Sequence, residues 1–411
     1  MTAATSGTSA FTLPGMVNLH SHAFQRGMAG LAERAGTGED SFWTWRDVMY
    51  RFLLRLTPED VEAIAAMAYV EMLEAGYTRV VEFHYVHHDI DGRPYANIAE
   101  MAERIAAAAA ATGIGLTLLP VLYSHGGFGG QPAASGQHRF INDFDQFLKL
   151  HEASDKSLAQ LPNAVLGFAP HSLRAVTLQQ LTDALACIPE GPVHIHVAEQ
   201  EKEVADCLAW SHARPVEWLL DAVPVDQRWC LIHATHMTAG ELRRVAASGA
   251  VVGLCPITEA NLGDGIFPAV DYCNLQGRFG IGTDSNVLIS LAEELRTLEY
   301  GQRLRDRRRN RLADPGMSIG RALFDAALSG GRQAAGSTAT PADQVLLDQA
   351  RVELAGRSGD TIADAWIFAS ARPLIADVIV DGRRVVEGGR HIIREVAEAR
   401  FAKVMTRLAN V

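Results

Sequence analysis

Cysteine is scarce in this chain of 411 residues, and its pattern gives no disulfide framework. The five cysteines are Cys187, Cys207, Cys230, Cys255 and Cys273. No two of them form a Cys-x-x-Cys pair, and their number is odd. Cys230 and Cys255 lie in apolar, strand-like runs, so we interpret both as small buried hydrophobic residues. A reducing, cytoplasmic environment is therefore the expectation.

The chain also lacks the segments that direct a protein into or across a membrane. Residues 1–10 are small and polar, without the charged and apolar regions of a signal peptide. No apolar run approaches the roughly 18 residues that a bilayer span requires. The net charge of −11 argues against nucleic acid or an anionic membrane as a partner. It does not argue against a small anionic substrate, which a few arginines can bind.

Nucleotide-binding signatures are missing as well. No Gly-x-Gly-x-x-Gly follows a predicted strand, and Gly126–Gly130 lacks the Gly-Lys-Ser/Thr ending of a phosphate loop. We interpret Gly126–Gly130 as a mobile loop. These absences argue against an open, doubly wound sheet.

Short apolar or β-branched runs recur along most of the chain and alternate with helical patterns. Strands are expected at Gly15–His20, Thr78–Tyr85, Gly115–Tyr123, Ala164–His171, Pro192–Ala198, Arg228–Ala234, Ala250–Cys255 and Arg278–Thr283. Helices are expected from Pro58 to Gly76 and at Met101–Thr112, Leu178–Cys187 and Glu201–Trp210. This alternation predicts an α/β fold, namely a (β/α)8 TIM barrel.

The pattern changes after about Gly336. Short strand-like pieces follow at Gln344–Leu347, Ala365–Ala369, Asp377–Val380 and Arg384–Glu387, joined by turns such as Asp381-Gly382. We expect a barrel over residues 14–335. A small β appendage would be built from the chain termini, residues 1–13 plus 336–411.

Histidines and one aspartate stand at the predicted carboxyl ends of several strands. His20 and His22, one residue apart on an extended segment, point the same way, although such a pair alone is equally typical of a polar strand end. His196 follows the fifth strand and Asp284 the eighth, and these ends converge on one rim of a barrel. We predict that His20, His22, His196 and Asp284 bind one metal ion. Zn²⁺ suits this set best, with Fe²⁺ or Mn²⁺ as alternatives, and it would lower the pKa of a bound water toward neutrality.

Neighbouring residues compete for some of these assignments. His194 lies on the same strand face as His196, and we favour His196 because it is nearer the carboxyl end. At the sixth strand we favour His233, with His236 at the surface. Glu199 could move protons to a leaving nitrogen. It could equally be a solvated acid at a helix N-terminus.

Together these strand ends resemble the metal-dependent amidohydrolase superfamily, specifically its mononuclear deaminase branch. No lysine ends the fourth strand, which speaks against the binuclear branch with its carboxylated lysine. Longer stretches resemble the formimidoylglutamate deiminase (N-formimino-L-glutamate iminohydrolase) family. They are Asn18–Arg26, Ser41–Arg46, Glu82–His88, His171–Arg174 and Thr258–Gly265.

The resemblance implies a function and a set of roles. The reaction would be zinc-dependent hydrolysis of N-formimidoyl-L-glutamate to N-formyl-L-glutamate and ammonia, in histidine degradation, by a cytoplasmic homodimer. Glu199, His233 and Asp284 would be catalytic. Substrate contacts would come from Gln25, Arg46, Tyr85, His171 and Arg174, with the arginines binding the two carboxylates.

Alternatives stay open at this point. Another deaminase of the branch would act on a different amidine, guanidine or nucleobase, and a further enzyme would release formamide instead of ammonia. A non-catalytic metal-binding barrel is a third alternative. Family members carry a longer N-terminal segment, so the small β domain is expected to be incomplete. The long connection Leu31–Leu56 is expected to form a lid.

Overall fold

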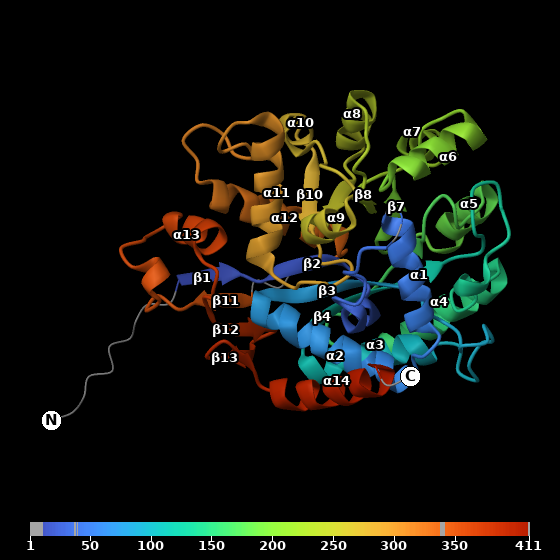
Figure 1. The fold of residues 1–411 in the computed structure, drawn as a ribbon, viewed down its shortest axis with the longest axis horizontal. Coiled ribbons are helices and arrows are strands. Elements are labelled where there is room, and N and C mark those ends of the chain that lie inside the picture. Colours follow the sequence, from blue (N-terminus) through green and yellow to red (C-terminus); the bar gives the residue numbers. More distant parts are fainter. Residues whose placement is uncertain (1–10, 37, 39, 338–341, 410–411) are drawn as a thin grey trace.

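A ring of parallel strands lies at the centre of the protein (Figure 1). The computed structural model describes residues 11–36, 38, 40–337 and 342–409. The strands are β2 (Met16–Ser21), β3 (Tyr77–His84), β4 (Gly115–Leu122), β5 (Val165–Leu166), β6 (Ala169–Pro170), β7 (Val193–Val197), β8 (Trp229–His233), β9 (Val251–Leu254) and β10 (Arg278–Ile281). They form two parallel sheets, β2–β3–β4–β5 with β6 beside β4, and β7–β8–β9–β10. Isolated bridges, Ser21 with Asp284 and Ser172 with His196, join the two sheets. The predicted TIM barrel is confirmed, with the fourth predicted strand divided into β5 and β6.

Helices surround this ring. They are α2 (Pro58–Ala75), α3 (Glu100–Thr112), α4 (Phe144–Leu158), α5 (Leu178–Cys187), α6 (Glu201–Ser211), α7 (Pro215–Ala222), α8 (Ala239–Ser248), α9 (Pro256–Leu262), α10 (Ala269–Asn274), α11 (Leu291–Asp306) and α12 (Ile319–Ala334). Local signals account for the bounds of α2: the Thr57 hydroxyl accepts from the Asp60 backbone N–H, and Pro58 occupies the first turn. Gly76, at φ 99°, ends the helix in a left-handed conformation that glycine adopts without strain.

The long connection Leu31–Leu56, which the sequence predicts as a lid, contains a helix. A short 3₁₀ helix, η1 (Ala23–Met28), precedes it, and α1 (Phe42–Leu53) fills its second half. The N-terminus of α1 is closed by a reciprocal cap, because the Ser41 hydroxyl accepts from the Trp43 N–H and the Thr44 hydroxyl accepts from the Ser41 N–H.

An antiparallel sheet lies beside the barrel, and segments from near both ends of the chain build it. Its order is β1 (Phe11–Pro14), β11 (Gln344–Leu347), β12 (Ile375–Val380), β13 (Arg383–Glu387) and β14 (Arg390–His391). The expected small β appendage is thus confirmed as a sheet, while the proposed domain boundaries stay a prediction. Residues 1–10 lie outside the described residues; they are most of the N-terminal segment assigned to this sheet and also the stretch predicted not to be a signal peptide.

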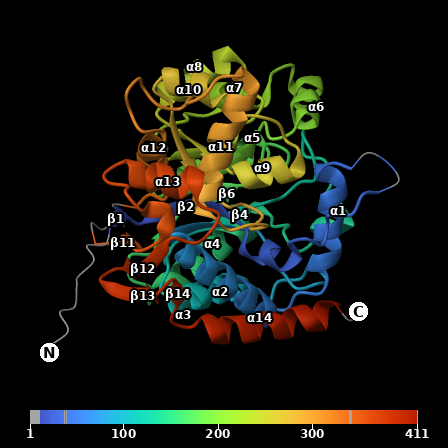
Figure 2. The same cartoon turned by 60° about the vertical axis from the view of Figure 1, so that its left-hand side comes forward.

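Two helices accompany this sheet, and one of them overturns a prediction. Ala365–Ala369 is not a strand but the end of α13 (Thr361–Ala369), whose Trp366 ring faces Phe324 of α12. A five-residue apolar run fits a buried helix as well as a strand, so periodicity could not separate them. The last helix, α14 (Arg394–Ala409), was not predicted. It runs along α2 (Figure 2), where Ala397 packs against Met67 and Val70.

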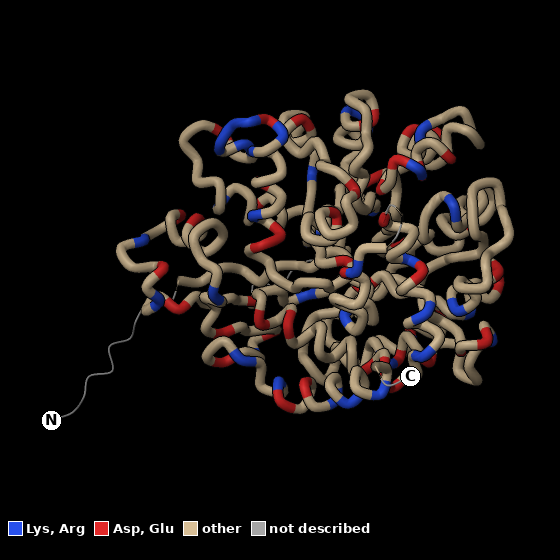
Figure 3. The backbone as a smooth tube through the Cα atoms, viewed as in Figure 1, with Lys and Arg blue, Asp and Glu red and all other residues tan. Residues whose placement is uncertain are grey.

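Acidic and basic residues are interspersed over the chain (Figure 3). The densest basic run, residues 303–311, begins in the last turn of α11 and continues beyond it, and several of its arginines pair with Glu299 or Asp306. Within the described residues, no helix has an apolar stretch long enough to cross a bilayer.

Candidate active site

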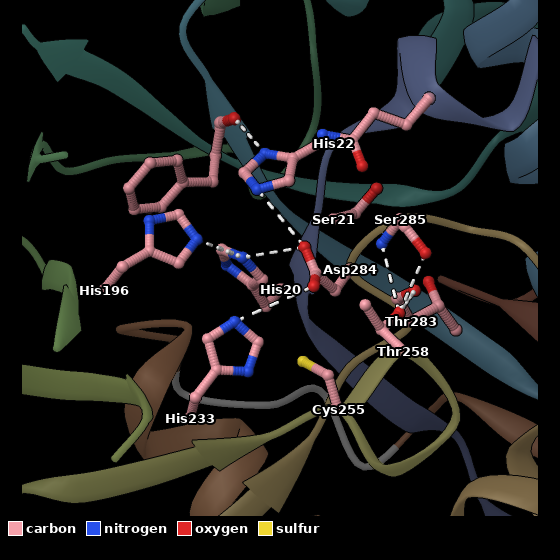
Figure 4. Close-up of polar contacts among 12 residues, drawn as sticks. His20, Ser21, His22, His196, His233, Cys255, Thr258, Thr283, Asp284 and Ser285 are labelled. Atoms are coloured by element: carbon pink, nitrogen blue, oxygen red, sulfur yellow. Dashed lines mark hydrogen bonds and ion pairs between the residues drawn. The ribbon is translucent and has the colours of Figure 1, made fainter. Parts of the chain in front are cut away.

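Four buried side chains converge at the carboxyl end of the barrel (Figure 4). The ligand atoms of His20, His22, His196 and Asp284 all lie within 4.8 Å of one another. The Nε2 atoms of His20 and His196 are 3.0 Å apart, and Oδ1 of Asp284 lies 3.4 Å from Nε2 of His20 and 3.3 Å from Nε2 of His22. The structure therefore brings together the four residues that the sequence predicts as metal ligands.

The backbone explains why residues from opposite ends of the chain meet here. Ser21 at the end of β2 bridges to Asp284 after β10, and the His22 N–H donates to the Asp284 carbonyl. Asp284 and His233 have φ values of 44° and 64°. Such left-handed backbone costs energy in a residue with a side chain and clusters at functional sites.

Hydrogen bonds to the outer ring nitrogens decide the tautomers of two of these histidines. Nδ1 of His22 lies 2.9 Å from the Phe83 carbonyl, and Nδ1 of His196 lies 3.0 Å from the His171 carbonyl. A carbonyl can only accept, so each Nδ1 carries the proton and each Nε2 keeps its lone pair. Burial also lowers the pKa of both rings, which keeps them neutral.

This arrangement fits a metal ion. The Nε2 lone pair of His22 faces the Asp284 carboxylate, and that of His196 faces the His20 ring. Together these four side chains form a buried cluster of electron-pair donors. Such groups repel one another unless a cation lies among them. Three imidazoles and one carboxylate are ligands that Zn²⁺ accepts, and histidines held through their outer nitrogen are typical of metal sites.

Glu199 and His233 lie beside this cluster. Nε2 of His233 is 3.8 Å from Oε1 of Glu199 and 3.7 Å from Oδ2 of Asp284. Burial raises the pKa of Glu199 to about 7. Burial alone would lower the pKa of His233, but the Glu199, Glu259 and Asp284 carboxylates outweigh it and raise that pKa to about 10. The site thus holds two groups able to exchange protons near the metal ligands.

A pocket of about 560 Å³, including its open mouth, adjoins these groups. All five predicted substrate-binding residues line it, together with His22, His196, Glu199, His233 and Asp284: they are Gln25, Arg46, Tyr85, His171 and Arg174. The Gln25 amide donates to the Tyr85 hydroxyl at 2.8 Å. The geometry groups these residues, whereas their contacts with a substrate stay a prediction.

The two arginines of this pocket have unused hydrogen-bonding capacity. The Nε atoms of Arg46 and Arg174 are buried, and neither has a hydrogen-bond partner in the described part of the chain. Instead their guanidinium groups lie 4.5 and 5.7 Å from the ring of Trp43. Half-buried guanidinium groups whose Nε atoms lack a hydrogen-bond partner among the described residues indicate a pocket for an anionic ligand.

Sequence reasoning missed several residues of the site. Glu259 lies 3.2 Å from Nδ1 of His233, and the predicted lid contributes α1 residues to the pocket wall. The pocket residues for which no substrate contact was predicted are Phe42, Trp45, Met49, Tyr50, Tyr123, Phe140 and Leu262. Glu259 had a detectable signal, because it comes four residues after the end of the predicted seventh strand, inside the stretch Thr258–Gly265.

The competing histidines lie elsewhere. His194 is deeper in the barrel, where its Nε2 pairs with the Ala334 carbonyl at 2.7 Å. His236 is half-buried and belongs to neither cluster of potential metal ligands.

Comparison with known proteins connects this geometry to a family. The model of the Amidohydrolase family matches residues 11–385. A formimidoylglutamate deiminase from Pseudomonas aeruginosa is 57% identical over 97% of this chain and 89% of its own length. An 8-oxoguanine deaminase from the same organism is 27% identical over 71% of this chain and 64% of its own length.

Solved structures agree with the fold. An amidohydrolase from Brucella melitensis superimposes with a TM-score of 0.94 at 57% identity, covering 97% of this chain and 90% of that one. An adenosine deaminase from Xanthomonas campestris, described with bound zinc, reaches a TM-score of 0.80 at 22% identity, over 98% of this chain and 87% of its own. At that identity the second structure supports the fold alone.

Proposed function

Because the chain belongs to the amidohydrolase family, we propose that it hydrolyses N-formimidoyl-L-glutamate to N-formyl-L-glutamate and ammonia. The observation that carries this proposal is that two arginines, Arg46 and Arg174, share one pocket with a cluster of potential metal ligands, and that the Nε atom of each lacks a hydrogen-bond partner among the described residues. N-formimidoyl-L-glutamate matches both features: its two carboxylates suit the two arginines, and its formimidoyl carbon suits a metal site that supports hydrolysis.

The metal in this proposal is Zn²⁺, held by His20, His22, His196 and Asp284. A divalent ion here lowers the pKa of water and so supplies a nucleophile at neutral pH. The carbonyl groups of Phe83 and His171 orient His22 and His196, keeping their Nε2 lone pairs directed at the site.

The protein's own groups then handle the protons. Asp284 is placed to accept the proton that water loses as it adds to the formimidoyl carbon, with the protonated His233 ring 3.7 Å from its Oδ2 as the neighbouring charge. Glu199, whose Oε1 lies 3.8 Å from the same Nε2 of His233, donates a proton to the terminal nitrogen. As the C–N bond to that nitrogen breaks and ammonia leaves, the added oxygen gives its remaining proton to the Glu199 carboxylate, and the carbon stays on glutamate as a formyl group.

Arginine contacts distinguish this substrate from that of a nucleobase deaminase. Aromatic rings also line the pocket, but a neutral purine would leave both arginines without an anionic partner, whereas two carboxylates suit the planar pairs of donors that Arg46 and Arg174 offer. The likeness to an 8-oxoguanine deaminase, at 27% identity, is accordingly the weaker guide to the substrate.

Product analysis tests the proposal. Zinc-loaded protein is incubated with N-formimidoyl-L-glutamate, and the products are identified by ¹³C NMR together with an enzymatic ammonia assay. Ammonia and N-formyl-L-glutamate in equal amounts support it, while formamide with glutamate, or no turnover, overturns it. Glu199→Gln should retain zinc but lower kcat by roughly 100-fold or more, since proton transfer contributes that much. Near-normal turnover of this variant would remove Glu199 from the mechanism.

Location and assembly are part of the same proposal. We propose a cytoplasmic homodimer that acts in histidine degradation. All five cysteines are free thiols, in agreement with a reducing compartment. Light scattering coupled to size exclusion tests the dimer, which a monomeric mass would exclude.

A further inference from the structure

The two oxygens of Asp284 face different histidines. Oδ1 faces His20 and His22 at 3.4 and 3.3 Å, and Oδ2 lies 3.7 Å from Nε2 of His233. Cys255 completes a second group, since the ligand atoms of His233, Cys255 and Asp284 all lie within 4.8 Å of one another. We propose that these three residues form a second metal site, which binds a soft divalent cation such as Zn²⁺ and shares Asp284 with the first site.

The surroundings of the second group resemble those of a metal site. Nδ1 of His233 lies 3.2 Å from Oε1 of Glu259, which leaves Nε2 turned toward Asp284. The same Glu259 oxygen accepts the Cys255 backbone N–H at 2.9 Å, so one carboxylate positions two of the three ligand residues. The Cys255 side chain points toward Asp284 and His233 (Figure 4).

The chemistry of the donor set selects the ion. A thiolate, an imidazole and a carboxylate are ligands that Zn²⁺ and Cd²⁺ take readily and Mg²⁺ does not. Binding exchanges the Cys255 Sγ–H proton and the His233 Nε2–H proton for bonds to the metal and releases both protons to solvent, with no change in oxidation state. The site needs no lysine after the fourth strand, because Asp284 is the shared ligand and the thiolate comes from the end of β9.

The second site fills after the first. It has three protein ligands, one of them shared, and a nearby cation repels the incoming ion. Occupation engages Nε2 of His233, the atom that faces both Glu199 and Asp284. Excess zinc therefore inhibits turnover. This consequence rests on the proposed function, whereas the binding itself does not.

Cobalt titration tests the site without relying on activity. Metal-stripped protein is dialysed against increasing Co²⁺, and bound metal is counted while the near-ultraviolet spectrum is recorded. We expect two ions per chain, with thiolate-to-cobalt charge-transfer absorption appearing only with the second equivalent. The wild-type spectrum alone is decisive: two equivalents without that absorption, or saturation at one ion, overturns the proposal.

Cysteine variants locate the site. Cys255→Ser should bind one ion without the charge-transfer absorption, and it should keep its turnover in excess zinc. Cys230→Ser is the matched control, because Cys230 is an equally buried cysteine on the neighbouring strand β8, and it should behave as wild type. Loss of the absorption in Cys230→Ser, or its retention in Cys255→Ser, contradicts the assignment. Two bound ions with the absorption but no turnover of formimidoylglutamate would support the second site and overturn only the proposed function.

Discussion

Nδ1 of His233 lies 3.2 Å from Oε1 of Glu259, and both side chains are buried. The imidazole is thereby oriented through its outer nitrogen, so that Nε2 faces Glu199 and Asp284. A carboxylate behind a functional histidine determines which nitrogen carries the proton and how the ring is turned. Glu259 is therefore a positioning residue for His233.

Replacing Glu259 by Gln tests this role. The variant loses the charge that orients His233, so we expect kcat to fall by about 10–100-fold with little change in KM. Steady-state kinetics measure the split between the two constants. Glu294→Gln is the control, because Glu294 is a buried glutamate that accepts the Ile257 N–H and is not bonded to His233. An equal fall in kcat in both variants would indicate a general effect of replacing a buried glutamate and would contradict a specific role for Glu259.

Metal content separates the two histidines of β7. His196 belongs to the ligand cluster, whereas His194 pairs with the Ala334 carbonyl deeper in the barrel. We expect His196→Asn to lose most of its bound zinc and His194→Asn to keep about one ion per chain, as measured by elemental analysis after dialysis. The reverse result would exchange the two assignments.

Replacement of an arginine by methionine tests whether the arginines of the pocket bind the carboxylates of the substrate. Arg174→Met removes a charged donor whose bond to a carboxylate contributes about 1.5–3 kcal/mol, so kcat/KM should fall by roughly 10–150-fold. Arg46→Met should behave alike. Arg51→Met, an exposed arginine on the same helix as Arg46, should change little. A substrate analogue with both carboxylates amidated should be equally poor for wild type and variants; a preserved difference would exclude carboxylate recognition.

Much of the site was predictable because parallel strands impose a simple rule. Side chains at the carboxyl ends of barrel strands share one rim, so the positions of His20, His22, His196 and Asp284 along the sequence were enough to bring them together. The strands themselves were visible because buried parallel strands are nearly continuous apolar runs.

The rest depended on tertiary contacts that no local pattern records. Ala365–Ala369 reads equally well as strand or helix, and only its packing against α12 decides. The role of Glu259 depends on the distance to a histidine 26 residues earlier in the chain. Likewise, part of the aromatic wall of the pocket comes from α1, and only the folded chain shows that this helix turns Phe42, Trp45 and Tyr50 toward the site.

A buried acid beneath the site should make stability depend on pH. Glu82 accepts the Ala23 N–H at 2.7 Å and lies 3.2 Å from the Tyr69 hydroxyl, and burial raises its pKa to about 8. In the unfolded chain its pKa is near 4.5. Between these values the folded protein holds a proton that the unfolded chain has lost. The free energy of unfolding therefore falls as the pH rises from about 4.5 to 8.

Glu82→Gln removes this titration while preserving the hydrogen-bonding shape, because an amide oxygen can accept from Ala23 and an amide N–H can face Tyr69. We expect its free energy of unfolding, relative to wild type, to increase by up to about 1.4 kcal/mol per pH unit between pH 5 and 8 and then to level off. Urea denaturation at fixed zinc content measures the difference. Glu152→Gln is the control, since Glu152 is exposed and its lowered pKa keeps it ionised in both states across this range, so its difference from wild type should stay flat. A flat difference for Glu82→Gln as well would show that Glu82 is ionised in the folded protein.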